Sequence, residues 1–232
     1  MTSSDMPEST RCVIIGGGAM GVGLLYFLAH EGWTDTVLVE KGELTSGSTW
    51  HAAGLVPNFI GDLNMAKVHQ EAISLYPVIE EETGLSAGWH GCGALRLAIT
   101  DNDVLWHRQV HAQLNQLGYE SYIVGQKEIK ELNPLFENID DVQTALYTPN
   151  DGWADPTGST NAMAKGARQL GAKVVRNNRV IDMNQRADGM WEVITEKGTI
   201  VAEHVVNAAG HYAPQLGAMV DLDVPIVSVI HQ

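Results

Sequence analysis

Two short apolar runs near the N-terminus flank a stretch in which apolar residues recur at helical spacing. The first run, residues 11–15, is rich in β-branched residues and ends at three glycines, as a buried parallel strand does when it enters a tight turn. Helical spacing follows over residues 19–31, and a second buried strand over residues 36–39 ends at Glu40. Strand, helix and strand together span about thirty residues, which is the size of one βαβ unit.

The middle of the chain alternates between helical and strand patterns. Pro77 is expected to kink or split the helix predicted over residues 63–83, and Asp101 is expected to cap the helix predicted over residues 101–117. Helices are predicted over residues 63–83, 101–117, 126–132 and 159–170, and strands over residues 94–99, 119–124 and 142–148.

The last third changes to strands joined by short turns. Strands are predicted over residues 174–183, 190–195 and 199–206, which indicates an antiparallel meander. The meander returns to a run that ends in the small residues Asn207-Ala-Ala-Gly210, and a further strand is expected over residues 224–230.

Composition narrows the class of protein. A chain of 232 residues with 44% hydrophobic and 18% charged residues can bury a core and is not intrinsically disordered. Its formal net charge of −14 argues against nucleic acid or an anionic membrane as the main partner. Cys12 and Cys92 lie far apart, which fits a reducing compartment. We find no membrane-spanning run and no targeting signal, so a cytoplasmic location is expected.

The first strand and helix enclose the motif Gly16-x-Gly18-x-x-Gly21, the context that a dinucleotide fingerprint requires. The first glycine permits the turn, the second lets the backbone approach a pyrophosphate, and the third allows close packing of helix and strand. Glu40 can accept hydrogen bonds from a ribose, and its charge disfavours NADP. The alternative is a glycine-rich turn that binds nothing, and the motif alone does not separate FAD from NAD.

Three later features favour FAD. The loop over residues 45–54 is dense in small residues that expose backbone donors to a phosphate or ring system. An antiparallel meander before a final sheet strand is typical of many FAD folds rather than of NAD dehydrogenases. The small residues of Asn207-Ala-Ala-Gly210 allow a cofactor to lie against the backbone.

These motifs resemble the N-terminal part of the dimethylglycine and sarcosine dehydrogenase family, which shares the D-amino-acid-oxidase-like fold. The most specific segment is Gly-Ser-Thr-Trp-His-Ala-Ala-Gly-Leu at residues 47–55. The resemblance is also carried by Gly-Gly-Gly-Ala-Met-Gly (16–21), Leu-Val-Glu-Lys (38–41), Asp151-Gly-Trp-Ala-Asp-Pro156, Asn207-Ala-Ala-Gly210 and His231-Gln232.

The resemblance implies an α/β fold with an FAD/NAD(P)-binding, Rossmann-like parallel sheet, an antiparallel β-meander and an inserted substrate-side region. The expected organisation is a disordered tail over residues 1–10 and one FAD-dependent oxidoreductase domain over residues 11–232, with the inserted region near residues 84–150. Because the family's flavoprotein domains are longer, the chain is expected to be truncated at its C-terminus.

By the same resemblance, Ala19 and Met20 lie at the pyrophosphate, Glu40 and Lys41 at the adenosine ribose, and Val180 at the adenine. His51 matches the position at which relatives bond the flavin covalently, although it can also merely hydrogen-bond its loop. His231 matches a catalytic histidine on the substrate side, although a surface role at a strand end is the alternative. The residues implied in cofactor binding are Gly16, Gly18, Ala19, Met20, Gly21, Glu40, Lys41, Gly47, Ser48, Thr49, Trp50, His51, Ala52, Ala53, Gly54, Leu55, Val180, Ala209 and Gly210.

The implied function is oxidative demethylation of dimethylglycine or sarcosine by hydride transfer to flavin N5. Electron-transfer flavoprotein, a quinone or oxygen would accept the electrons, and folate would take part only if a C-terminal region exists. Two alternatives stay open. One is another flavin oxidoreductase of this fold, acting on a different amine, a D-amino acid or glycerol phosphate. The other is a non-catalytic FAD-binding subunit or fragment that a second chain completes.

Other candidate chemistry is weaker. His107 and His111 have the i, i+4 spacing of half a zinc site, but no third ligand with convincing spacing follows, so a solvated helix face is favoured and no metal is predicted. Asp151 and Asp155 suggest paired carboxylates, but the neighbouring prolines and Gly152 favour a structural loop.

Overall fold

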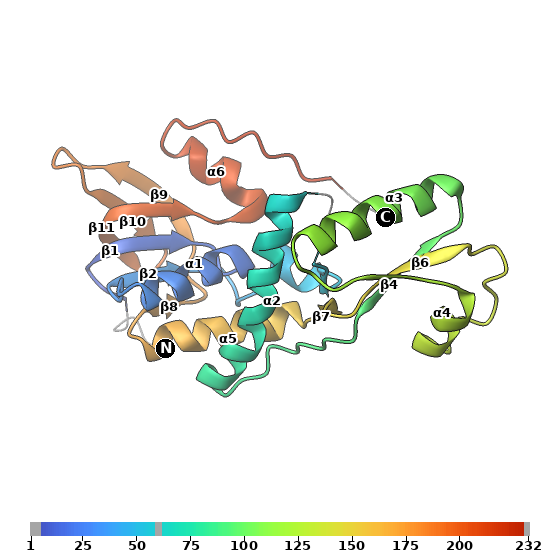
Figure 1. The fold of residues 1–232 in the computed structure, drawn as a ribbon. Helices are drawn as coiled ribbons and strands as arrows, with labels where there is room; N and C mark the ends of the chain where they lie inside the picture. Colours follow the sequence, from blue (N-terminus) through green and yellow to red (C-terminus); the bar gives the residue numbers. More distant parts are fainter. Residues whose placement is uncertain (1–5, 59–61, 230–232) are drawn as a thin grey trace. The chain divides into compact units, whose positions relative to one another are not determined.

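The computed structural model describes residues 6–58 and 62–229 (Figure 1). The chain divides into two units. Unit 1 comprises residues 1–53, 79–87 and 156–232, and unit 2 comprises residues 54–78 and 88–155. Unit 2 thus begins earlier in the chain than the inserted region expected near residues 84–150, whereas residues 84–87 of that region belong to unit 1.

Unit 1 is built on one six-stranded mixed sheet with the order β8-β2-β1-β11-β10-β9. The four strands from β8 to β11 are parallel, and β10 and β9 continue the sheet in antiparallel pairing. The predicted α/β class with a meander is confirmed. The strands are β1 (Ser9–Ile15), β2 (Thr36–Val39), β8 (Lys173–Val175), β9 (Val180–Gln185), β10 (Trp191–Thr195) and β11 (Gly198–Asn207).

Helices of unit 1 cover this sheet. Helix α1 (Ala19–His30) packs on α5 (Pro156–Gln169), where Gly166 lets the helices approach: a Cβ at this position would lie 2.7 Å from the Tyr26 ring. The same unit contains α6 (Ala213–Ala218) and the 3₁₀ helices η2 (Ser48–His51) and η3 (Gly210–Tyr212).

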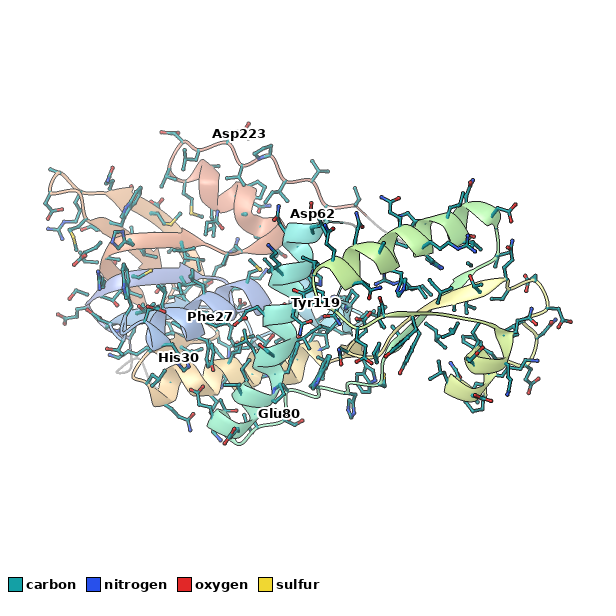
Figure 2. The ribbon with its side chains drawn as sticks, in the orientation of Figure 1. Phe27, His30, Asp62, Glu80, Tyr119 and Asp223 are labelled. Carbon is teal, nitrogen blue, oxygen red and sulfur yellow. The ribbon has the colours of Figure 1, made fainter. Side chains whose placement is uncertain are left out.

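Unit 2 contains the three-stranded antiparallel sheet β4-β6-β5 and the short pair β3-β7. Helix α2 begins here at Leu63, directly after Asp62 (Figure 2). The Asp62 carboxylate accepts hydrogen bonds from the N–H groups of Asn64 (2.8 Å) and Met65 (3.0 Å). The elements are β3 (Leu55–Val56), β4 (Ala94–Ala98), β5 (Tyr122–Val124), β6 (Thr144–Thr148), β7 (Gly152–Trp153), α2 (Leu63–Thr83), α3 (Asp101–Gln116) and α4 (Gln126–Leu132).

Two strand predictions and the predicted length of the N-terminal tail need correction. Residues 174–183 form two separate strands, because β8 ends at Val175 and joins β2, whereas β9 begins at Val180 and joins β10. The described part of the strand predicted over residues 224–230 has no regular secondary structure. The tail is also shorter than ten residues, because β1 begins at Ser9 and the Thr10 hydroxyl donates to the carbonyl of Asp35 (3.0 Å).

Two helix details also differ from the sequence prediction. Helix α2 continues through Pro77 as one helix of 21 residues, so Pro77 does not split it. Helix α3 is capped by Thr100 rather than by Asp101, since the Thr100 hydroxyl accepts from the N–H of Asp103 (3.2 Å) and the Asp103 carboxylate accepts from the N–H of Thr100 (2.8 Å). Among the described residues, no helix is long and apolar enough to cross a membrane.

His107 is buried, with 4% of its surface exposed, so the predicted solvated face of α3 is wrong at this position. Burial lowers the pKa of His107, Asp103 opposes this effect, and Arg96 lowers the pKa further. Because the folded state disfavours the proton that the unfolded chain binds, stability should fall as pH drops below about 6.5 towards the folded pKa.

We expect the urea concentration at the midpoint of unfolding to depend less on pH, between pH 7.5 and 5.5, in His107→Gln than in the unsubstituted chain. His111→Gln, one turn further along α3, should retain the original dependence because His111 is only partly buried. Parallel pH profiles for the His107 variant and the unsubstituted chain would contradict the prediction.

Candidate functional site

Three parallel strands of unit 1 end side by side. Ile15 at the end of β1 is in register with Val39 of β2 and with Asn207 of β11. The turn that follows β1 is tied to its neighbours, because the Gly16 N–H donates to the Val39 carbonyl and the Ala208 N–H donates to the Ile15 carbonyl, both at 2.9 Å. The carboxyl ends of parallel strands are where α/β folds bind ligands, and here the glycine motif, Glu40 and the small-residue segment meet.

Two glycines of the motif are required by close approach of the backbone. Gly16 has φ +121°, and a Cβ there would lie 2.3 Å from the carbonyl oxygen of Ala208. A Cβ on Gly21, in the first turn of α1, would lie 2.0 Å from the carbonyl oxygen of Gly16. Both positions therefore exclude any side chain, as the dinucleotide fingerprint predicts for the turn and for the packing of helix and strand.

The N-terminus of α1 is suited to an anion. Gly18 caps the helix without a side chain that accepts a hydrogen bond, and the first turn has no acidic residue. The Ala19 N–H donates to the Thr49 hydroxyl (2.9 Å), which brings the loop after β2 against the helix start. The exposed amides and the positive end of the helix dipole favour a phosphate here.

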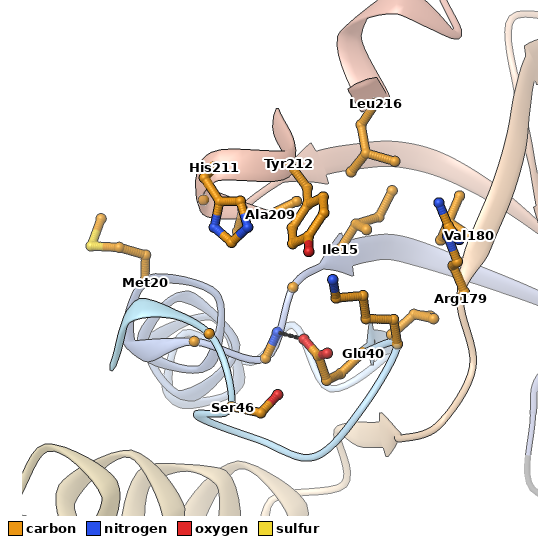
Figure 3. A pocket seen from close by; sticks show the side chains of 18 of the residues that line it. Ile15, Met20, Glu40, Ser46, Arg179, Val180, Ala209, His211, Tyr212 and Leu216 are labelled. Atoms are coloured by element: carbon orange, nitrogen blue, oxygen red, sulfur yellow. Dashed lines mark hydrogen bonds between the residues drawn. The ribbon is translucent and has the colours of Figure 1, made fainter. Parts of the chain in front are cut away.

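The Glu40 carboxylate is fixed by main-chain donors on both oxygens. One oxygen accepts from the Gly17 N–H (2.6 Å; Figure 3), and the other accepts from the Gly42 N–H (2.8 Å). A carboxylate offers about four lone-pair sites, so acceptor capacity for a ribose hydroxyl is left. Glu40 thus also orders the glycine-rich turn, a role that the sequence did not suggest.

These elements enclose a cavity of about 450 Å³ within unit 1 (Figure 3). This volume is in the range of small-molecule sites. Of the residues implied by sequence, the cavity brings together Gly16, Gly18, Ala19, Met20, Glu40, Lys41, Gly47, Ser48, Thr49, Val180, Ala209 and Gly210. Gly17, Ser46 and Ala208 also line the cavity and lie within segments that the sequence had implied. Sequence reasoning missed the lining residues Ile15, Val39, Asn178, Arg179, His211, Tyr212, Gln215, Leu216 and Met219.

Lys41 and Tyr212 meet at this cavity. The Lys41 ammonium lies 3.3 Å from the centroid of the Tyr212 ring. Lys41 lowers the pKa of Tyr212 through a hydrogen bond and its charge, and Arg179 adds a smaller effect of the same sign. The only signal for Tyr212 was its place two residues after Asn207-Ala-Ala-Gly210, and no motif marked Arg179.

Several implied residues are not among those that line the cavity. Gly21 is buried in the first turn of α1, and residues 50–53, at the end of η2 and just after it, are not lining residues. Gly54 and Leu55 belong to unit 2. His231 lies outside the described residues.

His51 is exposed at the end of η2, and the centroid of its ring lies 3.9 Å from the centroid of the Trp50 ring. Its Nδ1 lies 3.1 Å from the carbonyl oxygen of Gly47. Since a carbonyl can only accept, this bond requires the proton on Nδ1 and leaves Nε2 with its lone pair in a neutral ring. His51 therefore presents a nucleophilic nitrogen to the outside of its loop.

In unit 2, Asp151 is a buried structural residue. One carboxylate oxygen accepts from the main-chain and side-chain nitrogens of Asn58 (both 2.8 Å), and the other accepts from the Thr148 hydroxyl (2.7 Å). These bonds tie residue 58 to the turn between β6 and β7, which agrees with the structural loop predicted there. Within the described residues, no group of three or more His, Cys, Asp or Glu side chains is arranged to hold a metal ion.

Comparison with known proteins gives the family. The family model described as "FAD dependent oxidoreductase" matches residues 11–232. The chain is 44% identical over 225 residues to mitochondrial dimethylglycine dehydrogenase of Rattus norvegicus, a match that covers 97% of this chain and 26% of the relative. Mitochondrial sarcosine dehydrogenase of Mus musculus is 35% identical over 239 residues, covering 99% of this chain and 26% of the relative.

The fold agrees with this result. L-proline dehydrogenase from P. horikoshii superimposes with a TM-score of 0.86 at 29% identity, over 96% of this chain and 58% of that chain. The chain thus spans about a quarter of the length of the two dehydrogenases named above. The expected resemblance, the fold class and FAD as the family's cofactor are confirmed, and the chain belongs to the FAD-dependent oxidoreductase family.

Proposed function

We propose that this chain binds FAD as part of an enzyme that demethylates an N-methylated glycine, dimethylglycine or sarcosine. The observation that carries the proposal is the cavity of unit 1, where the main chain around Gly16, the start of α1 and the fixed Glu40 carboxylate converge. The identity to dimethylglycine and sarcosine dehydrogenases supports the substrate class.

The residues present fit the cofactor. Gly16 and Gly21 keep the turn free of side chains, so the amides at the start of α1 would hold the diphosphate. Glu40 would accept a ribose hydroxyl while the N–H groups of Gly17 and Gly42 hold it in place. When bound, FAD supplies an acceptor for the hydride that leaves the N-methyl carbon.

The roles of the remaining predicted residues are part of the proposal. His51 would bond the flavin through its free nitrogen, and residues 47–55 would run along the cofactor. His231 would orient the amine or take its proton. We further propose a cytoplasmic location and an electron acceptor such as electron-transfer flavoprotein, a quinone or oxygen. A second chain completing the fold, or a folate-binding region, would belong to the larger assembly.

Anaerobic reduction of the bound flavin tests the function. We expect the purified chain, loaded with FAD, to lose its long-wavelength flavin absorption on addition of dimethylglycine or sarcosine, and to keep it with D-alanine or glycerol 3-phosphate. Bleaching by either of the latter alone would favour the other flavin oxidoreductases. Bound flavin that no substrate reduces until a second polypeptide is added would favour a non-catalytic FAD-binding subunit.

A further inference from the structure

The cavity of unit 1 has two chemically different halves. One half is formed by the main chain of the glycine-rich turn and by residues 46–49, at the start of α1. In the other half, Ile15, Val39, Val180 and Leu216 belong to one apolar cluster (Figure 3). A nucleotide has the same division, since its diphosphate needs backbone donors and its base needs an apolar surface. The apolar half therefore suits the base.

Arg179 lies in this second half, next to Val180 (Figure 3). Its backbone is fixed on both sides, because its carbonyl accepts from the Glu196 N–H (3.0 Å) and the preceding Asn178 donates its N–H to the Glu40 carbonyl (2.9 Å). Asn178 is fully buried, and its side-chain oxygen accepts from the Lys197 N–H (3.1 Å). A rigid backbone thus presents an exposed arginine side chain to the cavity.

The charge of Arg179 is not neutralised by an acid. No ion pair within the described ranges, 6–58 and 62–229, involves it. Of the described residues that line the cavity, Glu40 alone has a carboxylate, and the Gly17 and Gly42 N–H groups hold it. The field of Arg179 nevertheless extends across the cavity, since it contributes to the lowered pKa of Tyr212. The Arg179 guanidinium is therefore available to a ligand in the cavity.

We propose that Arg179 lays its planar guanidinium against the base of an adenine nucleotide whose diphosphate lies at the start of α1, and so helps select cofactors that contain ADP. This inference rests on the proposed function and adds a specificity residue to it. A guanidinium stacks on aromatic faces, whereas a lysine ammonium is a compact charge without a plane. Arg179→Lys therefore keeps the charge and removes the stacking surface.

Calorimetric titration with ADP and with inorganic pyrophosphate tests this role. We expect Arg179→Lys to weaken ADP binding about fivefold and to leave pyrophosphate binding unchanged. Arg186→Lys is the matched control, because Arg186 lies at the end of the same hairpin, pairs with Asp188 (3.2 Å) and does not line the cavity. This control should bind both ligands as the unsubstituted chain does.

Three other outcomes overturn the inference. An ADP affinity unchanged by Arg179→Lys would exclude stacking, and an equal loss for ADP and pyrophosphate would assign Arg179 to the phosphates. If the unsubstituted chain binds neither ADP nor FAD, the proposed cofactor site fails as well. Failure of the amine to reduce bound flavin would instead refute the proposed substrate and leave the ADP result standing.

Discussion

Gly21→Ala is expected to lower the affinity for FAD by about 100-fold. The new Cβ would lie 2.0 Å from the Gly16 carbonyl oxygen and 3.3 Å from the Ala208 Cβ. The Gly16 main chain cannot yield easily, because its N–H is hydrogen-bonded to the Val39 carbonyl of β2. The start of α1 must therefore move instead. That movement takes the helix amides away from the diphosphate, and losing two charge-assisted hydrogen bonds costs about 3 kcal/mol.

Gly23→Ala is the matched control, two residues further along the same helix. A Cβ at Gly23 meets nothing within 4 Å, so this substitution adds helix propensity without a clash. We expect it to raise the free energy of unfolding by about 0.5–1 kcal/mol and to leave FAD affinity unchanged.

Flavin fluorescence titration measures the affinity of both variants, and circular dichroism with thermal unfolding shows whether they are folded. A folded Gly21 variant that binds FAD as tightly as the unsubstituted chain would refute the assignment of this turn to the cofactor. If the Gly21 variant does not fold, Ala19→Pro offers a second route. Proline at the first helical position is tolerated but removes the amide that donates to Thr49 and holds the loop after β2 against the start of α1. It too should therefore weaken FAD binding.

The N-terminal βαβ unit could be predicted from sequence because the hydrophobic pattern and the glycine spacing indicated the same structure there. The apolar runs predicted two buried strands, and β2 has the predicted bounds of Thr36–Val39. The glycine spacing then placed Gly16, Gly18 and Glu40 at one cavity, since parallel strands end at the same edge of a sheet.

The other features of the fold and the site depended on tertiary contacts, which a local sequence pattern does not predict. The run over residues 174–183 reads as one strand, but its middle bends at Asn177, which has φ +52°, and its halves join opposite edges of the sheet. Arg179 and Tyr212 reach the cavity through this turn and through η3, far apart in sequence. The buried His107 is a further example, because helical spacing shows which residues share a face of α3 but not which elements cover that face.

The second large effect concerns the bond between protein and cofactor. We expect the flavin of the unsubstituted chain to remain with the acid-precipitated pellet, and His51→Ala to release all of it into the supernatant. The physical reason is the hydrogen bond from Nδ1 to the Gly47 carbonyl (3.1 Å), which sets the tautomer and leaves Nε2 free to bond the flavin. No other histidine lies within the segment over residues 47–55.

Two variants separate the bond from the shape of the loop. His51→Gln retains a donor for the Gly47 carbonyl but has no nucleophilic nitrogen, so it should bind FAD and still release it in acid. His204→Ala removes an exposed histidine of β11 that does not line the cavity, and its pellet should remain yellow. Flavin released from the unsubstituted chain would refute covalent attachment while keeping the FAD site. A yellow pellet from both His51 variants would move the attachment to another residue, because neither alanine nor glutamine can form the bond.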